Sequence, residues 1–187
     1  LIELFGGRER GGLREALEET LMAAYEEGLV ADASIAETEA QRADFWRLRE
    51  GIVEAQRFEG GSIKHDVSVP VSAVPSFIEE ASKAVAQACP GIRPVAFGHV
   101  GDGNVHFNLS QPEGADTAAF LARWEELTRL VHDIVHRFDG SISAEHGIGR
   151  MKREENFRFK SELELEMMRR VKQAFDPGNL MNPGKLL

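Results

Sequence analysis

The strongest constraint on the fold is the order of strands and helices in the middle of the 187-residue sequence. Residues 62–69 alternate between apolar and polar side chains, which is the two-residue period of a half-buried strand. The predicted elements are a strand at 62–69, a helix at 72–89, strands at 93–100 and 104–109, a helix at 117–138 and a strand at 141–145. This order is that of the ferredoxin-like split unit. We therefore predict an α+β fold, in which residues 62–145 form a ferredoxin-like unit and helices cover one face of an antiparallel sheet.

The flanking segments continue the alternation of strands and helices. The predicted elements are a strand at 1–5, a helix at 13–27, a strand at 29–36, a helix at 37–57 and a helix from Ser161 to Phe175. The first 36 residues would fit the rear half of a second ferredoxin-like unit, and residues 150–187 are expected to form a helical tail. Ser161 and Glu164 have the spacing of a capping box. The glycine-rich stretch 6–12 is expected as a loop, and it lacks the Lys-Ser/Thr pair of a phosphate-binding loop.

The amino-acid composition limits which partners and which cellular compartment we expect for the chain. The chain carries 22 Lys and Arg against 31 Asp and Glu, a formal charge of −9, which disfavours nucleic acid as a partner. No apolar run reaches the roughly 20 residues that a membrane-spanning helix needs. Cys89 is the single cysteine, so an intrachain disulfide and a cysteine-built zinc site are excluded. We expect a reducing, cytoplasmic setting, with peripheral membrane association left open. Because the sequence opens on Leu1 with neither Met nor a signal peptide, we also expect a fragment of a longer protein.

Two histidines flank a predicted hairpin turn. Asp-Gly between two apolar strands is a strong signal for a type I′ turn, which here would consist of Asp102 and Gly103. That turn would pair Gly101 with Asn104 and Val100 with Val105, and it would place His99 directly opposite His106. Directly opposed residues share a face of the sheet, so the two imidazoles could hold one metal ion. The alternative is a hairpin with two exposed histidines and no metal.

A second segment offers further chemistry. Glu145 and His146 are adjacent and are followed by Gly147 and Gly149. Glu145 could supply a third metal ligand, which leaves positions open for a substrate, and His146 could then act as a base. Adjacent residues on a strand point to opposite faces, so both can serve one site only if the chain turns there. The alternative is a Glu and a His at the rim of a turn.

Other titratable residues give weaker signals. His132 and His136 lie four residues apart on a predicted helix, and we expect both on its solvated face. Lys64 and Asp66 alternate with the apolar residues of their strand, and we expect both as surface charges. Arg49 is expected to be an exposed residue of its helix.

Several segments together resemble the C-terminal part of FAD-linked oxidases of the vanillyl-alcohol-oxidase type. They are Trp46 to Glu50, Ile63 to Pro70, Gly98 to Asn108, Ser143 to Gly149, and Asp176-Pro177 with Asn182 to Lys185. The resemblance is strongest to the D-2-hydroxy-acid dehydrogenases, which include enzymes for D-2-hydroxyglutarate and D-lactate and the flavin subunit of glycolate oxidase. It implies that residues 1–187 form a C-terminal substrate or cap domain, and that an N-terminal domain absent from this sequence holds the FAD.

The resemblance also implies roles for individual residues. The implied metal ligands are His99, His106 and Glu145, with zinc as the expected ion, the implied catalytic base is His146, and the implied substrate-binding residues are Arg49, Lys64 and Asn108. The implied reaction is oxidation of a 2-hydroxy acid to a 2-oxo acid with hydride transfer to FAD, followed by electron transfer to a protein or a quinone. Val53 stands where some 2-hydroxyglutarate enzymes have a hydroxyl residue, which leaves the identity of the substrate open.

The implied reaction leads to two expectations for the chain by itself. It should be inactive without the flavin domain, and it should self-associate through the apolar surface that such a domain would cover. Whether the complete protein is a homo-oligomer is left open. Two other classes of function fit the same residues: a metal-dependent hydrolase or non-haem iron oxygenase that uses the two His and the Glu, and a non-catalytic metal-binding module.

Overall fold

The structure, a computed structural model, describes residues 1–6 and 11–187. The chain divides into two compact units, Leu1–Ala55 and Gln56–Leu187, and each is considered by itself. Part of the glycine-rich stretch predicted as a loop, residues 7–10, lies outside the described residues. None of the helices in the described part of the chain has both the length and the apolar character needed to cross a membrane.

The first unit contains two helices, α1 (Leu13–Glu26) and α2 (Glu39–Ala55), both at the predicted places. The predictions of strands at 1–5 and 29–36 were wrong, because the structure assigns no strand to either segment. A strand needs a hydrogen-bonded neighbour, and neither segment pairs with one. Apolar side chains from both segments and both helices instead line an open groove of about 900 Å³. The predicted rear half of a second ferredoxin-like unit is therefore absent from the described residues.

The second unit contains the sheet. Its strands are β1 (Ser62–Ile63), β2 (Asp66–Ser68), β3 (Arg93–His99) and β4 (Asn104–Ser110). The strand β4 is central: it pairs with β3 on one side and with β1 and β2 on the other, always antiparallel. A single bridge between Ser68 and Ser141 adds the chain after residue 140 to the far side of β2. The α+β fold is confirmed, and the neighbours follow the ferredoxin-like order. The predicted strand at 141–145 was wrong beyond Ser141, because the chain leaves the sheet there.

The helices of the second unit agree with the sequence pattern only in part. They are α3 (Val74–Ala88), α4 (Thr117–Ala122), α5 (Trp124–Arg137), α6 (Arg153–Phe159) and α7 (Glu162–Phe175). Short 3₁₀ turns occupy Gln56–Glu59, Val71–Ala73 and Val100–Asp102. The single helix predicted at 117–138 is interrupted at Arg123, and α6 was not predicted. The capping box of Ser161 and Glu164 is confirmed, with the Ser161 hydroxyl and the Glu164 carboxylate each accepting a backbone N–H.

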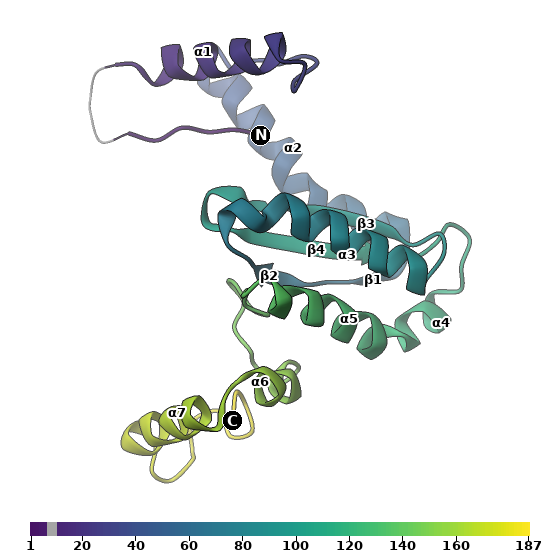
Figure 1. The fold of residues 1–187 in the computed structure, drawn as a ribbon, viewed down its shortest axis with the longest axis vertical. Helices are drawn as coiled ribbons and strands as arrows, with labels where there is room; N and C mark the ends of the chain where they lie inside the picture. Colours follow the sequence, from purple (N-terminus) through teal and green to yellow (C-terminus); the bar gives the residue numbers. More distant parts are fainter. Residues whose placement is uncertain (7–10) are drawn as a thin grey trace. The chain divides into compact units, whose positions relative to one another are not determined.

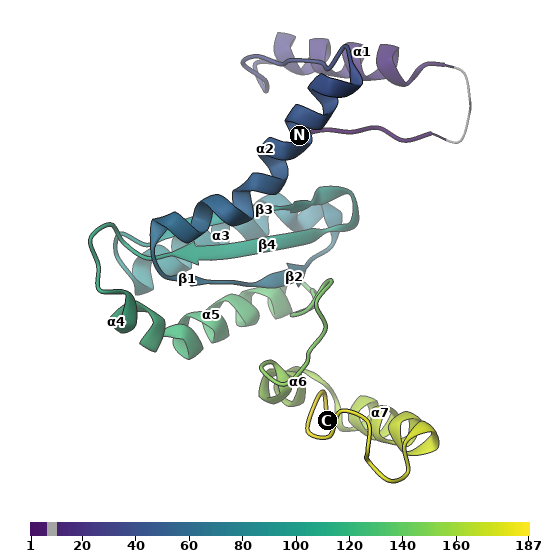
Figure 2. The same ribbon diagram turned by 180° about the vertical axis from the view of Figure 1, so that it is seen from behind.

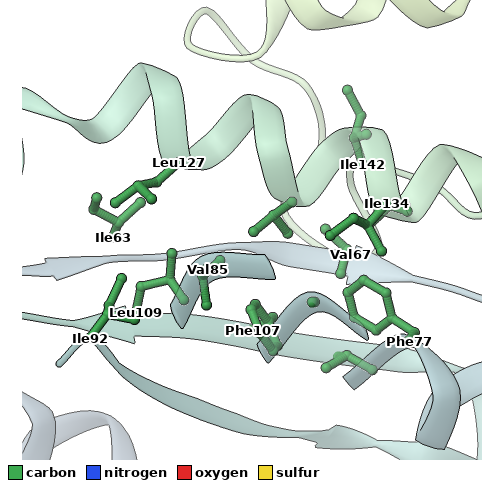
Figure 3. Packing of buried hydrophobic residues seen from close by; sticks show 14 of the residues in the cluster. Ile63, Val67, Phe77, Val85, Ile92, Phe107, Leu109, Leu127, Ile134 and Ile142 are labelled. Atoms are coloured by element: carbon green, nitrogen blue, oxygen red, sulfur yellow. The ribbon is translucent and has the colours of Figure 1, made fainter. Parts of the chain in front are cut away.

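One face of the sheet packs against α3 and α5, which run along it in Figures 1 and 2. The side chains that meet there are apolar and fully buried, and Figure 3 shows how they interlock. They include Ile63 and Val67 from the edge of the sheet, Phe107 and Leu109 from β4, Phe77 and Val85 from α3, and Leu127 and Ile134 from α5. Ile63, His65, Val67 and Val69 are all buried, as the alternation at 62–69 predicts, but Asp66 between them is buried as well. The opposite face of the sheet carries the polar side chains of β4, beside Val95 and Phe97 of β3.

Candidate metal centre

The polar face of the sheet carries the candidate site. Along β4, Val105 and Phe107 point into the core, so His106 and its alternate neighbours face the other way. His106 lies directly opposite Asp66 on β2 and opposite Phe97 on β3. Three adjacent strands therefore bring their side chains to one place on this face.

The hairpin places both histidines on that face, although its register differs from the prediction. His99 pairs with Asn104, not with His106, and the turn spans the four residues Val100 to Gly103. The predicted type I′ turn requires a positive φ at both central residues, whereas only Gly103 of the two has one, at 80°. The register is shifted by two residues, and a shift of two keeps every side chain on its original face. His99 and His106 are therefore diagonal neighbours, with ring centroids 6.4 Å apart.

Glu145 completes a group of three potential metal ligands. Its two carboxylate oxygens lie 3.6 Å from Nε2 of His99 and 3.6 Å from Nε2 of His106. One ligand atom from each of the three side chains lies within 4.8 Å of the other two. Two donors that each lie about 2.1 Å from one tetrahedral zinc ion would be about 3.4 Å apart. The side chains therefore fit a divalent ion in both type and spacing.

His146 lies beside this group. Its ring stacks on that of His106 at 5.9 Å between centroids and 23° between planes. The side chain is 69% exposed, which leaves it open to a small molecule at the polar face. The structure thus brings together all four residues singled out on the two segments, and the chain turns after Ser141 as the sharing of one site by Glu145 and His146 requires.

Asp66 is the member of the site that sequence reasoning missed. It was expected as a surface charge, yet it is only 4% exposed. Its Oδ2 accepts hydrogen bonds from the backbone N–H groups of Glu145 at 2.9 Å and His146 at 2.8 Å. Burial by itself would raise the pKa of Asp66, but these two donors, together with the nearby His146 and Lys152 side chains, hold the pKa below its ordinary value. The ferredoxin-like order, which sets residues 62–69 beside 104–109, was the signal that could have placed Asp66 next to a histidine.

Lys152 also binds the backbone of β2 and of the segment that leads to Glu145. Its Nζ donates to the backbone carbonyls of Ile142 at 2.8 Å and Asp66 at 3.3 Å. Burial lowers the pKa of Lys152, and the nearby Asp66 charge opposes that shift. The loop that carries Glu145 and His146 is therefore held to β2 by both a carboxylate and an ammonium group.

The three residues implied for substrate binding come from both units of the chain. Asn108 is buried on β4, and its Nδ2 donates to Oε1 of Gln56 at 2.9 Å. Lys64 is exposed and lines a small cavity of about 190 Å³ beside α5 and α6. Arg49 belongs to α2 of the first unit, where it lines the apolar groove. Asn108 is two residues from His106 on β4 and so lies on the same face of the sheet, and the substrate-binding roles of all three residues stay predictions.

A second pair of histidines lies inside the fold. His132 was expected to be solvated but is 1% exposed, and its Nδ1 lies 3.0 Å from a carboxylate oxygen of Glu155, to which it can donate. His65 is 2% exposed, and its Nδ1 lies 2.7 Å from the carbonyl oxygen of Phe107. Burial lowers the pKa of both rings, that of His65 to about 3. His136, in contrast, is exposed as expected. The buried pair is neutral and belongs to the interior, not to the candidate metal centre.

Known proteins resemble the chain along nearly its whole length. Residues 1–186 match the family model for the C-terminal domain of FAD-linked oxidases. The chain is 45% identical over 177 residues to D-2-hydroxyglutarate dehydrogenase of Xanthomonas citri pv. viticola, a match that covers 92% of this chain and 37% of that protein. It is 37% identical to the mitochondrial D-2-hydroxyglutarate dehydrogenase of Arabidopsis thaliana, covering 100% of this chain and 32% of that protein. A putative mitochondrial D-lactate dehydrogenase of Schizosaccharomyces pombe is 34% identical over 180 residues, which are 91% of this chain and 32% of that protein.

These matches confirm the resemblance noted in the motifs. The chain spans about a third of the length of the relatives it matches. It belongs to the family of FAD-linked oxidase C-terminal domains.

Proposed function

We propose that this chain is the substrate-binding part of a flavin-dependent D-2-hydroxy-acid dehydrogenase and that it supplies a divalent metal site. The observation that carries the proposal is the cluster of His99, His106 and Glu145, with one ligand atom of each within 4.8 Å of the others. Two relatives named D-2-hydroxyglutarate dehydrogenase and one named as a putative D-lactate dehydrogenase support the substrate class. The chain covers about a third of these relatives, and we propose that an FAD domain lies in the remaining two thirds of the complete enzyme.

The proposed metal ligands are two imidazoles and a carboxylate, a set that zinc accepts. A bound divalent ion would polarise the hydroxyl group of a 2-hydroxy acid and lower its pKa. His99 and Glu145 are half exposed, whereas His106 is largely buried, so the cluster opens toward solvent on one side. That opening is where the substrate would approach.

The proposed base is His146. Its exposed ring lies against the ring of His106, and so it can reach a molecule held at the cluster. It would accept the hydroxyl proton of the substrate at a ring nitrogen as the hydride leaves the substrate carbon. FAD, held outside this chain, would accept that hydride. An electron-transfer protein or a quinone would then take the electrons from the flavin.

Charged side chains would hold the carboxylate of the substrate. Arg49 can make a bidentate pair with a carboxylate, and Lys64 offers a single positive charge. Asn108 would line the pocket as a neutral donor. A substrate with two carboxylates, such as 2-hydroxyglutarate, has one more group for these cations to bind than lactate has.

The test uses the complete flavoenzyme. Bound metal is measured by elemental analysis, and flavin reduction by D-2-hydroxyglutarate and D-lactate is followed in a stopped-flow instrument without oxygen. We expect a divalent metal at about one per chain, loss of reduction after chelation and recovery when zinc is added. His106→Ala should lower metal content, whereas His136→Ala, which removes an exposed histidine outside the cluster, should leave it unchanged. Full-rate flavin reduction by metal-free enzyme would refute the proposal, and a metal-dependent reaction without flavin would favour a hydrolase or an oxygenase.

A further inference from the structure

Glu145 and His146 are adjacent in sequence, yet both side chains lie at the same site. In an extended strand, consecutive side chains point to opposite faces and so do consecutive N–H groups. Here three consecutive N–H groups turn toward a single residue, Asp66. The amide of Ala144 donates to its carbonyl oxygen at 3.3 Å, and those of Glu145 and His146 donate to its Oδ2. Successive N–H groups that converge in this way form an anion-binding concavity, and the anion is a side chain of the protein itself.

The other oxygen of the same carboxylate faces the histidine strand. Oδ1 of Asp66 accepts a hydrogen bond from Nδ2 of Asn104 at 3.3 Å and lies 3.8 Å from Nδ1 of His106. Oδ2 lies 3.8 Å from Nδ1 of His146. One buried carboxylate is therefore within reach of a proposed ligand on β4 and of the loop that carries another ligand and the base.

We propose that Asp66 is the positioning residue of this site: its side chain captures the backbone at 145 and 146 and thereby turns Glu145 and His146 toward the histidines of the hairpin. The inference rests on the proposed function for the roles of those two residues. It adds that their shared orientation comes from β2, the strand that pairs with β4 of the hairpin, and not from the loop sequence itself. Gly147, with φ at +74°, lets the chain continue after the turn.

Asp66→Ala in the complete protein tests the inference. We expect the amide protons of Glu145 and His146 to exchange at least about tenfold faster with solvent, because they lose a buried charged acceptor. Metal affinity should fall by about 10- to 100-fold, as is usual when a group that orients a ligand is removed. The probes are hydrogen exchange by mass spectrometry and titration with zinc against a competing chelator.

Two further variants separate positioning from loss of charge or loss of folding. Asp66→Asn keeps an oxygen that can accept both N–H groups. Its NH₂ group would meet Nδ2 of Asn104, but rotation of the Asn104 amide would present Oδ1, which accepts no hydrogen bond within the described residues. This variant should retain slow exchange and most of the metal affinity. Asp176→Ala is the matched control: Asp176 is also a buried carboxylate that accepts two backbone N–H groups, those of Leu180 and Met181. It should expose those amides and leave metal affinity within about twofold, since it removes no group near the cluster.

The outcomes separate the inference from the proposed function. Unchanged exchange at Glu145 and His146 in Asp66→Ala, or faster exchange with unchanged metal affinity, overturns the inference. An Asp66→Asn variant that protects the amides but binds metal as weakly as Asp66→Ala also overturns it, because charge and not position would then be responsible. A wild-type protein that binds no metal refutes the proposed function instead, and the exchange rates of Asp66→Ala then decide by themselves whether Asp66 anchors the loop.

Discussion

Lowering the pH should destabilise the second unit through His65. The ring is buried between the carbonyl of Phe107 and the hydroxyl of Thr128, with Nδ1 donating to the carbonyl and Nε2 3.3 Å from the hydroxyl oxygen. Burial lowers the pKa of His65 from 6.5 to about 3, although the Phe107 carbonyl favours the charged form. Between these two values the unfolded chain binds a proton that the folded chain does not. The free energy of unfolding therefore falls as the pH drops below about 6.5.

The size of the effect follows from the two pKa values. Each pH unit within that window changes the free energy of unfolding by up to about 1.4 kcal/mol. Between pH 7.5 and pH 5.0 the His65 contribution is about 2 kcal/mol, since only the lower part of this interval lies inside the window. His132 is also buried with a lowered pKa, so it acts in the same direction and must be held constant in the comparison.

Urea unfolding of wild type and His65→Asn at the two pH values isolates the effect. The Asn amide can donate to the Phe107 carbonyl but does not titrate, and His132 is present in both proteins. Fluorescence of Trp124 in a Trp46→Phe background reports on the second unit only. We expect the wild type to lose about 2 kcal/mol more than the variant on going to pH 5.0. His136→Asn, which alters an exposed histidine, should behave like the wild type. Parallel pH profiles for wild type and His65→Asn would refute the reasoning.

Three further results are expected. In the complete enzyme, His146→Ala should keep its metal yet reduce flavin about 100- to 10,000-fold more slowly, because it would remove the proposed base. If this variant loses the metal while His106→Ala retains it, the two proposed roles have been exchanged. Arg49→Ala should raise the KM for the 2-hydroxy acid more than it lowers kcat, by the loss of a charge-assisted pair of about 1.5–3 kcal/mol, and an unchanged KM in steady-state assays would remove Arg49 from the substrate site. Phe107→Ala, at a fully buried position of β4, should lower the free energy of unfolding by about 3–5 kcal/mol in urea titrations, and a loss below 1 kcal/mol would contradict the packing of Figure 3.

The histidine cluster shows why a partly wrong local prediction still led to the correct face. The turn was taken as Asp102-Gly103, and the observed register differs by two residues. Because side chains on a strand alternate with a period of two, His99 and His106 stay on one face under either register. The parity of the spacing, which is readable from the chain, mattered more than the exact pairing.

Predictions that depended on neighbours far along the chain were less successful. Asp66 and His132 were assigned to solvent from the polarity of their side chains, and both are buried. Each is stabilised inside by a partner at least 23 residues away: Glu155 for His132, and the loop at 145–146 for Asp66. Polarity predicts exposure only when no such partner is available. The segments 1–5 and 29–36 were apolar enough for strands, but among residues 1–6 and 11–187 no strand pairs with them.

The α+β fold, the extents of the main helices and the set of residues in the cluster were all accessible from local pattern, since alternation and helical periodicity are properties of short stretches of chain. The common orientation of Glu145 and His146 could not be predicted from local pattern. It arises because β2 lies between the hairpin and the segment after Ser141, so that one carboxylate can accept hydrogen bonds from a loop about 80 residues further along. Contacts of this kind exist only once the sheet has assembled, because closing so long a loop is favourable only when many other contacts form with it.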